Sequence, residues 1–116
     1  MATHNFRQLN IWTRSMDLAR TIYMLTSGLP NDEKYGLKSQ INRCAVSIPS
    51  NIAEGSGRST NKDFSRFLDI ALSSSYELET QLILVRDLFV LEVNETIEEL
   101  NEVQKMIVGF RNKLKN

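Results

Sequence analysis

The chain has 116 residues, of which 14 are basic and 14 acidic, so its formal net charge is zero. This length suits one domain, residues 1–116, which can bury about two-thirds of its unfolded surface without disulfides or metals. The hydrophobic share of 41% is ordinary for a globular protein and too high for a disordered chain. Neutrality argues against a generally cationic nucleic-acid binder, because such proteins bind by neutralising phosphates.

The cysteine count and the hydropathy pattern bear on the compartment. Cys44 is the only cysteine, so no intrachain disulfide can form, and a lone thiol is typical of a reducing compartment. The N-terminal residues MATHNFRQLN contain no apolar run of signal-peptide length. No stretch approaches the ~20 apolar residues that span a bilayer. We therefore expect a cytoplasmic protein that does not contact a membrane.

The first predicted helix covers residues 9–27 and carries two apolar stripes. One stripe is Leu9, Trp12, Met16, Ala19 and Tyr23, and the other is Ile11, Leu18, Ile22, Leu25 and Leu29. Together they cover about 200° of the helix surface, twice the usual core-facing width of about 100°. This excess predicts that copies of the chain cover one another. The candidate contacts between copies are Ile11, Leu18, Ile22 and Leu25.

The second predicted helix follows a turn at residues 28–32 and starts near residues 32–34. Its core stripe is Leu37, Ile41, Cys44, Ile48 and Ile52. Pro49 falls inside this pattern and lacks a backbone N–H, so it should kink the helix or begin a new one. The glycines of residues 55–57 should end it.

The third and fourth predicted helices begin at polar capping residues. Thr60 is a suitable N-cap for a long helix that extends to about Phe89, with Asp63 at the reciprocal capping position. Asn94 should cap the fourth helix, which continues to the basic residues near the C-terminus. Short connections make consecutive helices antiparallel neighbours. The sequence therefore predicts an all-α, up-down-up-down four-helix bundle.

The residues for metal binding or covalent catalysis are missing from the sequence. His4 is the only histidine, and there is no Glu-x-x-His pair of the kind that di-iron bundles use. One cysteine cannot build a zinc site. Cys44 lies on an apolar stripe without a histidine to activate it, which favours a buried structural cysteine. We expect no metal, no cofactor and no catalytic residue; an enzyme built around Cys44, Glu54 and Glu77 is the least favoured alternative.

A polar stripe runs along the second predicted helix. Arg43, Ser47, Ser50 and Glu54 follow one another at spacings of four, three and four residues, so they share one face of the helix. With possible partners, the candidate polar network is Arg43, Ser47, Ser50, Asn51, Glu54 and Glu77. Two interpretations stay open: a solvated face with weak ion pairs, or a polar network at a contact between subunits.

The charges are unevenly distributed along the neutral chain. Residues 34–66 carry six basic and two acidic side chains, whereas residues 67–116 carry five basic and nine acidic ones. The candidate residues for binding nucleic acid or another anion are Lys34, Lys38, Arg58, Lys62 and Arg66. Phosphate binding requires such charges to lie together, and the alternative is ordinary solvated surface.

Residues 47–55, SIPSNIAEG, form the most specific motif in the chain. They resemble the "SI-x-x-NIAEG" core of the four-helix-bundle family encoded by intervening sequences of bacterial 23S rRNA genes. Further matches are Leu9-x-x-Trp12, Tyr35–Gly36–Leu37 with Gln40, Gly57–Arg58, residues 67–71 (FLDIA) and residues 77–79 (ELE). The resemblance covers nearly the whole chain.

The resemblance implies a four-helix bundle that is often assembled as a homopentameric barrel, and it implies no catalytic residues. A related protein, the accessory protein of diversity-generating retroelements, binds a reverse transcriptase and nucleic acid. Our leading hypothesis is a non-catalytic, homo-oligomeric helical module that binds a macromolecular partner, either a protein or a nucleic acid. Nucleic-acid binding through a local basic face is the first alternative, and a small-molecule enzyme is the second.

Overall fold

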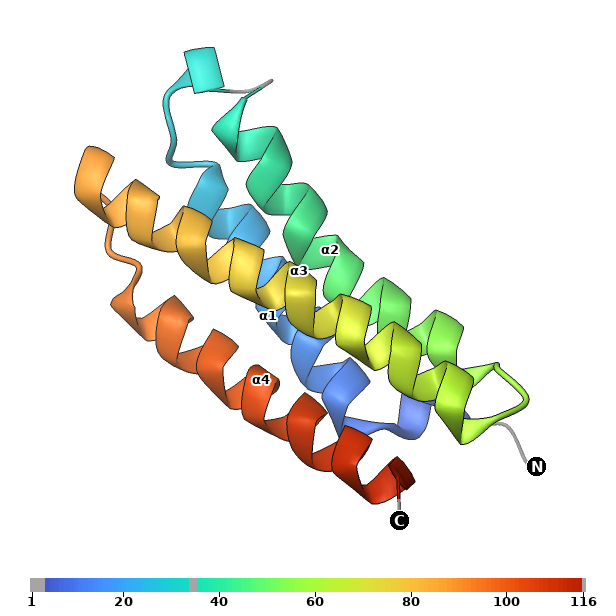
Figure 1. The fold of residues 1–116 in the computed structure, drawn as a ribbon. Coiled ribbons are helices and arrows are strands. Elements are labelled where there is room, and N and C mark those ends of the chain that lie inside the picture. Colours follow the sequence, from blue (N-terminus) through green and yellow to red (C-terminus); the bar gives the residue numbers. More distant parts are fainter. Residues whose placement is uncertain (1–3, 34–35, 116) are drawn as a thin grey trace.

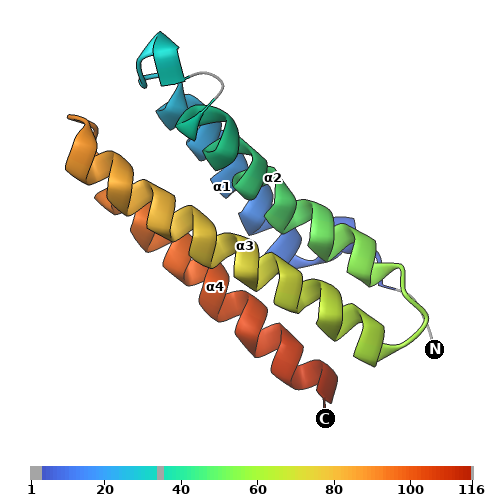
Figure 2. The ribbon, with the colours of Figure 1, turned by 45° about the horizontal axis from the view of Figure 1, so that its top comes forward.

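The computed structural model describes residues 4–33 and 36–115. The elements in chain order are η1 (Phe6–Gln8), α1 (Asn10–Thr26), η2 (Asn31–Glu33), α2 (Leu37–Ser56), α3 (Asn61–Leu88) and α4 (Asn94–Lys115). The described residues contain no strand. Consecutive long helices run antiparallel side by side, and α4 also packs against α1, which closes the bundle (Figure 1, Figure 2). The predicted all-α four-helix bundle is confirmed.

The bundle is elongated, with extents of 48 × 23 × 20 Å. The start of α1, the turn between α2 and α3, and the end of α4 lie at the same end (Figure 1). We call this the terminal end, and the opposite one the distal end. None of the described helices combines the length and the apolar character that crossing a bilayer would require.

The core consists of aliphatic side chains from all four helices and one aromatic ring. Fully buried residues include Leu18 and Ile22 of α1, Ile41, Ile48 and Ile52 of α2, Phe64, Leu68, Leu78, Leu82 and Val85 of α3, and Leu100, Val103 and Ile107 of α4. Each such side chain stabilises the fold by about 1.5–3 kcal/mol relative to exposure. The core stripe predicted for α2 is therefore confirmed at Ile41, Cys44, Ile48 and Ile52, which are all buried.

The two apolar stripes of α1 have the reverse of their predicted roles. Ile11, Leu18 and Ile22 are buried in the chain's own core, and Leu25 is partly buried against it. Their assignment as contacts between copies is wrong, because this stripe faces the centre of the bundle. The other stripe, which contains Trp12 and Tyr23, lies at the outer boundary between α1 and α2.

The start of α2 differs from the prediction, and one of the two alternatives at Pro49 is excluded. The helix begins at Leu37 rather than at residues 32–34, because residues 31–33 form the separate turn η2. Lys34 and Tyr35 lie outside the described residues. Pro49 starts no new helix, since α2 is continuous through it. The neighbouring turns are held in the core by Ile48 and Ile52, which compensates for the missing proline N–H.

The predicted cap of α3 is confirmed and that of α4 is wrong. The Thr60 hydroxyl oxygen accepts a hydrogen bond from the Asp63 amide at 3.1 Å. Asn94 is instead the first residue of α4, and its own amide donates to the Glu92 carboxylate at 2.8 Å. The Asn94 side chain accepts a hydrogen bond from Arg86 at 3.3 Å, so it is not free to cap the helix.

Polar side chains tie α4 to α3 along the outside of the bundle. The Arg111 guanidinium forms an ion pair with Asp69 at 2.7 Å. About two turns earlier along α4, the Gln104 side-chain amide donates a hydrogen bond to the Glu79 carboxylate at 3.0 Å. These links join α4 to α3 at two points along the outside of the bundle.

Gly55 allows α2 and α3 to approach closely near the terminal end. A Cβ atom at this position would lie 2.6 Å from the Phe67 Cβ and 2.9 Å from the Phe64 Cδ1. None of the described glycines has a positive φ, so Gly55 is needed for space rather than for backbone conformation. Gly109 of α4 is the opposite case, because nothing lies within 4 Å of its added Cβ.

Gly55→Ala should lower the free energy of unfolding by about 1–3 kcal/mol, because overpacking forces the two helices apart. Gly109→Ala, the control, should raise it by up to ~1 kcal/mol, because alanine favours an exposed helix. Urea unfolding followed by circular dichroism measures both. Equal stability of Gly55→Ala and the parent chain would contradict the close approach of α2 and α3.

Candidate functional site

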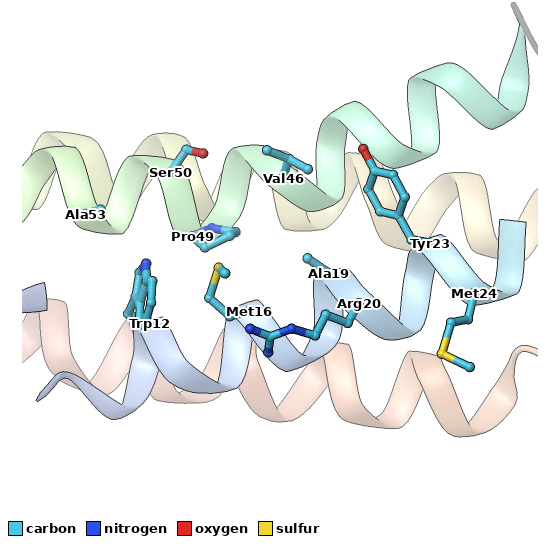
Figure 3. Close-up of a pocket in the computed structure, with 10 residues that line it drawn as sticks. All are labelled: Trp12, Met16, Ala19, Arg20, Tyr23, Met24, Val46, Pro49, Ser50 and Ala53. Atoms are coloured by element: carbon cyan, nitrogen blue, oxygen red, sulfur yellow. The ribbon is translucent and has the colours of Figure 1, made fainter. Parts of the chain in front are cut away.

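An apolar groove of about 610 Å³ runs along the outside of the bundle between α1 and α2. Its lining residues are Trp12, Met16, Ala19, Arg20, Tyr23 and Met24 from α1, and Val46, Pro49, Ser50 and Ala53 from α2 (Figure 3). Nearly all of these side chains are apolar. The groove is therefore a candidate binding surface.

The groove stays open because large residues of α1 face small residues of α2. Trp12 and Met16 reach towards Pro49 and Ala53, and these short side chains cannot fill the space above them (Figure 3). Tyr23 remains 52% exposed beside Val46. Contiguous apolar surface of this kind on a soluble protein is typical of a contact site.

Several groove residues were absent from the sequence-based site. Met24, Val46, Pro49 and Ala53 were not singled out as binding residues, and Ser50 was assigned to the polar network. The signal was present, because the outer face of the second helix carries small residues opposite a bulky apolar stripe. Sequence periodicity alone could not show that these two faces meet.

A polar cleft of about 380 Å³ lies between α2 and α3, on the next side of the bundle. Its lining residues are Gln40, Arg43, Cys44, Ser47, Ser74 and Glu77. The hydroxyls of Ser47 and Ser74 form a hydrogen bond of 2.8 Å between the helices. The Asn51 side-chain amide donates to the Ser47 hydroxyl at 3.0 Å.

The structure thus brings together only part of the predicted polar network. Arg43, Ser47, Asn51 and Glu77 meet at the cleft, whereas Ser50 lines the groove instead. Arg43 and Glu77 share the cleft, but no ion pair of the described residues joins them. Sequence reasoning missed Gln40 and Ser74, which come from separate helices.

Cys44 is a buried thiol at the base of the cleft. Burial raises its pKa to about 11, and a hydrogen bond to the Glu77 carboxylate adds to the rise, against weaker opposing effects of Gln81 and Arg43. Such a thiol stays protonated near neutral pH and is a poor nucleophile. Glu54 lies ten residues further along α2, about 15 Å away, so the proposed group of Cys44, Glu54 and Glu77 is not assembled.

The predicted basic residues are divided between the two ends of the bundle. Arg58, Lys62 and Arg66 are exposed at the terminal end. Lys38 lies in the first turn of α2, about 30 Å from Arg58 along the helix direction. Lys34 lies outside the described residues. The predicted single basic face is therefore not formed by these residues.

The terminal end gathers basic residues that the sequence-based site omitted. The Asn61 side-chain amide donates to the Leu114 carbonyl at 3.2 Å, which places Lys113 and Lys115 beside the start of α3. The Arg58 guanidinium stacks over the Phe67 ring at 4.5 Å. Residues more than fifty positions apart in sequence meet here, so linear spacing could not reveal the cluster.

The described residues contain no group of three or more His, Cys, Asp or Glu side chains that could hold a metal ion. The groove has Arg20 and Tyr23 as its only ionisable residues. Among the described residues, neither the apolar groove nor the polar cleft therefore has the geometry of a metal centre.

A family model described as "23S rRNA-intervening sequence protein" matches residues 7–109. The chain is also similar to a crystal structure from Bacteroides thetaiotaomicron, described as a protein with unknown function from the S23 ribosomal protein family. The two are 25% identical, the match covers 88% of this chain and 95% of that one, and the TM-score is 0.80. No curated protein matches the chain.

The raised Cys44 pKa predicts a stability loss at high pH. The unfolded chain releases the thiol proton near its ordinary pKa of 9.0, before the folded chain does at about 11. The contribution of the Cys44 thiol to the free energy of unfolding is therefore complete below pH 9 and is lost as the pH rises to 11. Between pH 8.5 and 10.5 the parent chain should lose about 1–2 kcal/mol more than Cys44→Ala, as measured by urea unfolding. Identical pH slopes would contradict the buried, protonated thiol.

Proposed function

The chain belongs to the family of 23S rRNA-intervening sequence proteins, and from that premise we propose that it is a non-catalytic helical module that associates with itself and binds a macromolecular partner. The related solved protein is described as having unknown function, so the proposal depends on the surfaces of this chain. The observation that carries it is the apolar groove between α1 and α2. We propose the cytoplasm as its location.

The composition of the groove supports a protein contact. Tryptophan, tyrosine, methionine and arginine are enriched at the centres of protein interfaces. Trp12, Met16, Arg20 and Tyr23 supply all four types within a few turns of α1. Leaving this apolar surface in water costs about 25 cal/mol for each Å², and a partner would remove that cost.

A second copy is the partner that we favour. Copies with zero net charge do not repel one another strongly, and most soluble oligomers consist of identical chains. The family resemblance favours a homopentamer. The absence of catalysis stays part of the proposal, supported by the protonated thiol of Cys44 and by a groove without a titratable acid–base pair.

Light scattering on the parent chain should give a multiple of 13.3 kDa at micromolar concentration. Tyr23→Glu with Val46→Glu should reduce the mass to one chain, because two charges would then stand on opposite walls of the groove. Both positions are exposed, so the helical circular dichroism should be unchanged. Gly109→Glu with Asn112→Glu, which adds the same charge to α4, should assemble normally. A monomeric parent chain would refute self-association.

Nucleic-acid binding is a second candidate function, supported by the basic cluster at the terminal end. Arg58, Lys62 and Arg66 come from the α2–α3 turn and the start of α3, and Lys113 and Lys115 come from the adjacent end of α4. Several lysines and arginines presented together can replace the counterions of a phosphate backbone. Arg66 is partly neutralised by Asp63 at 3.6 Å, which weakens the cluster on one side.

Lys62→Glu should weaken binding of a single-stranded RNA oligonucleotide roughly tenfold, because reversal removes one phosphate contact and adds repulsion. Lys38→Glu is the matched control at the distal end and should have little effect. Gel retardation at low and moderate salt measures both. Binding that is absent, or that does not weaken as salt rises, would remove nucleic acid as a partner.

A further inference from the structure

We propose that copies associate head to tail, with an exposed ridge on α3 of one copy occupying the α1–α2 groove of the next. The α3 ridge is the row Ile70, Leu84 and Leu88, with Glu77 between them. This inference rests on the proposed self-association and names the second surface of that contact.

The α3 ridge is a row of large apolar side chains that the rest of the described chain leaves uncovered. Leu84 is 45% exposed and Leu88 is 67% exposed. Ile70, Glu77 and Leu84 follow one another at seven-residue spacing, which places them along one line of the helix. The core residues Leu78 and Val85 lie about 100° round α3 from Glu77 and Leu84 and are fully buried. Ile70, Leu84 and Leu88 are therefore outside the buried core of their own bundle, whereas Glu77 also lines the polar cleft between α2 and α3.

The dimensions of the ridge and the groove agree. From Glu77 to Leu88 the ridge extends about 17 Å, at 1.5 Å for each residue. From Trp12 to Met24 the groove extends about 18 Å by the same measure. One groove can thus receive Glu77, Leu84 and Leu88 together. Ridge side chains packed into the groove of another helix pair are the normal way in which helices dock.

The charges and shapes also favour a contact between the α3 ridge of one copy and the groove of another over a symmetric contact between two grooves. Arg20 borders the groove near the middle of its length, where its exposed ion pair with Asp17 is weak and can be exchanged. The ridge carries the carboxylate of Glu77, which complements Arg20. Asp87, next to Leu88 and in a weak exposed ion pair with Arg86 at 3.7 Å, adds a second negative charge beside the ridge. A symmetric groove-to-groove contact would instead bring two copies of Arg20 together. It would also oppose two hollow surfaces and leave the α3 ridge exposed.

The position of the two surfaces determines what the contact builds. α2 lies between α1 and α3, so the groove and the ridge occupy neighbouring sides of the bundle (Figure 2). Each copy then has one groove and one ridge, and a pair of copies leaves one of each unused. Further copies can add until the rotation closes a ring, which is how heterologous contacts behave.

Two complementary variants test this pairing. The groove variant is Tyr23→Glu with Val46→Glu, and the ridge variant is Leu84→Glu with Leu88→Glu. Each should be a folded monomer alone, because one half of the contact is blocked. Mixed in equal amounts, they should form a one-to-one heterodimer, because the intact groove of the ridge variant receives the intact ridge of the groove variant. Native mass spectrometry with one variant carrying a mass tag measures this.

The outcomes separate this inference from the proposed function. If the parent chain assembles and the ridge variant assembles equally well, the ridge is not used, and self-association stands without it. If both folded variants are monomers and their mixture is also monomeric, the two surfaces do not pair and the inference is overturned. If the parent chain is itself a monomer, both proposals fail. Tyr76→Glu, about 80° round α3 from Leu84, is the control and should assemble normally.

Discussion

The close approach of α2 to α3 is the contact on which the rest of the molecule depends. It exists because Gly55 has no side chain to hold Phe64 and Phe67 away, and because the short hydroxyls of Ser47 and Ser74 bridge the helices further along. On its α1 side, α2 carries a separate set of small residues, where proline, serine and alanine stand opposite tryptophan and methionine. The groove lies along this second small-residue face of α2.

The sequence was sufficient for the helices and most of the core, because apolar residues at helical spacing must be buried together. It was insufficient for α1, where two apolar stripes satisfied the same rule. Periodicity measures how much apolar surface a helix has and not which part faces inward. Side-chain chemistry could have separated the stripes: Ile11, Leu18 and Ile22 are purely aliphatic, whereas Trp12 and Tyr23 carry polar groups that favour a boundary.

The candidate sites depended on contacts between distant segments, and there the sequence was least informative. Spacing along one helix correctly grouped Ser47 with Asn51, which share a hydrogen bond. It grouped Lys38 with Arg58 incorrectly, because a twenty-residue helix separates them by the length of the bundle. It could not bring Lys113 to the start of α3, since that neighbourhood is created only when α4 docks. Local pattern predicts local structure, and the surfaces that bind partners are assembled from several helices.

The two ends of the chain meet in the folded protein. The His4 ring packs against Phe64 at 5.2 Å between centroids, with the rings tilted by 59°, and it lies 5.9 Å from Phe110 of α4. The His4 amide donates to the Ser56 carbonyl at 3.1 Å. Closing a loop of this length costs more chain entropy than closing a short one. The N-terminal segment therefore joins α2, α3 and α4 at one end of the bundle, so a change at residue 4 would be felt by three helices that are far apart in sequence.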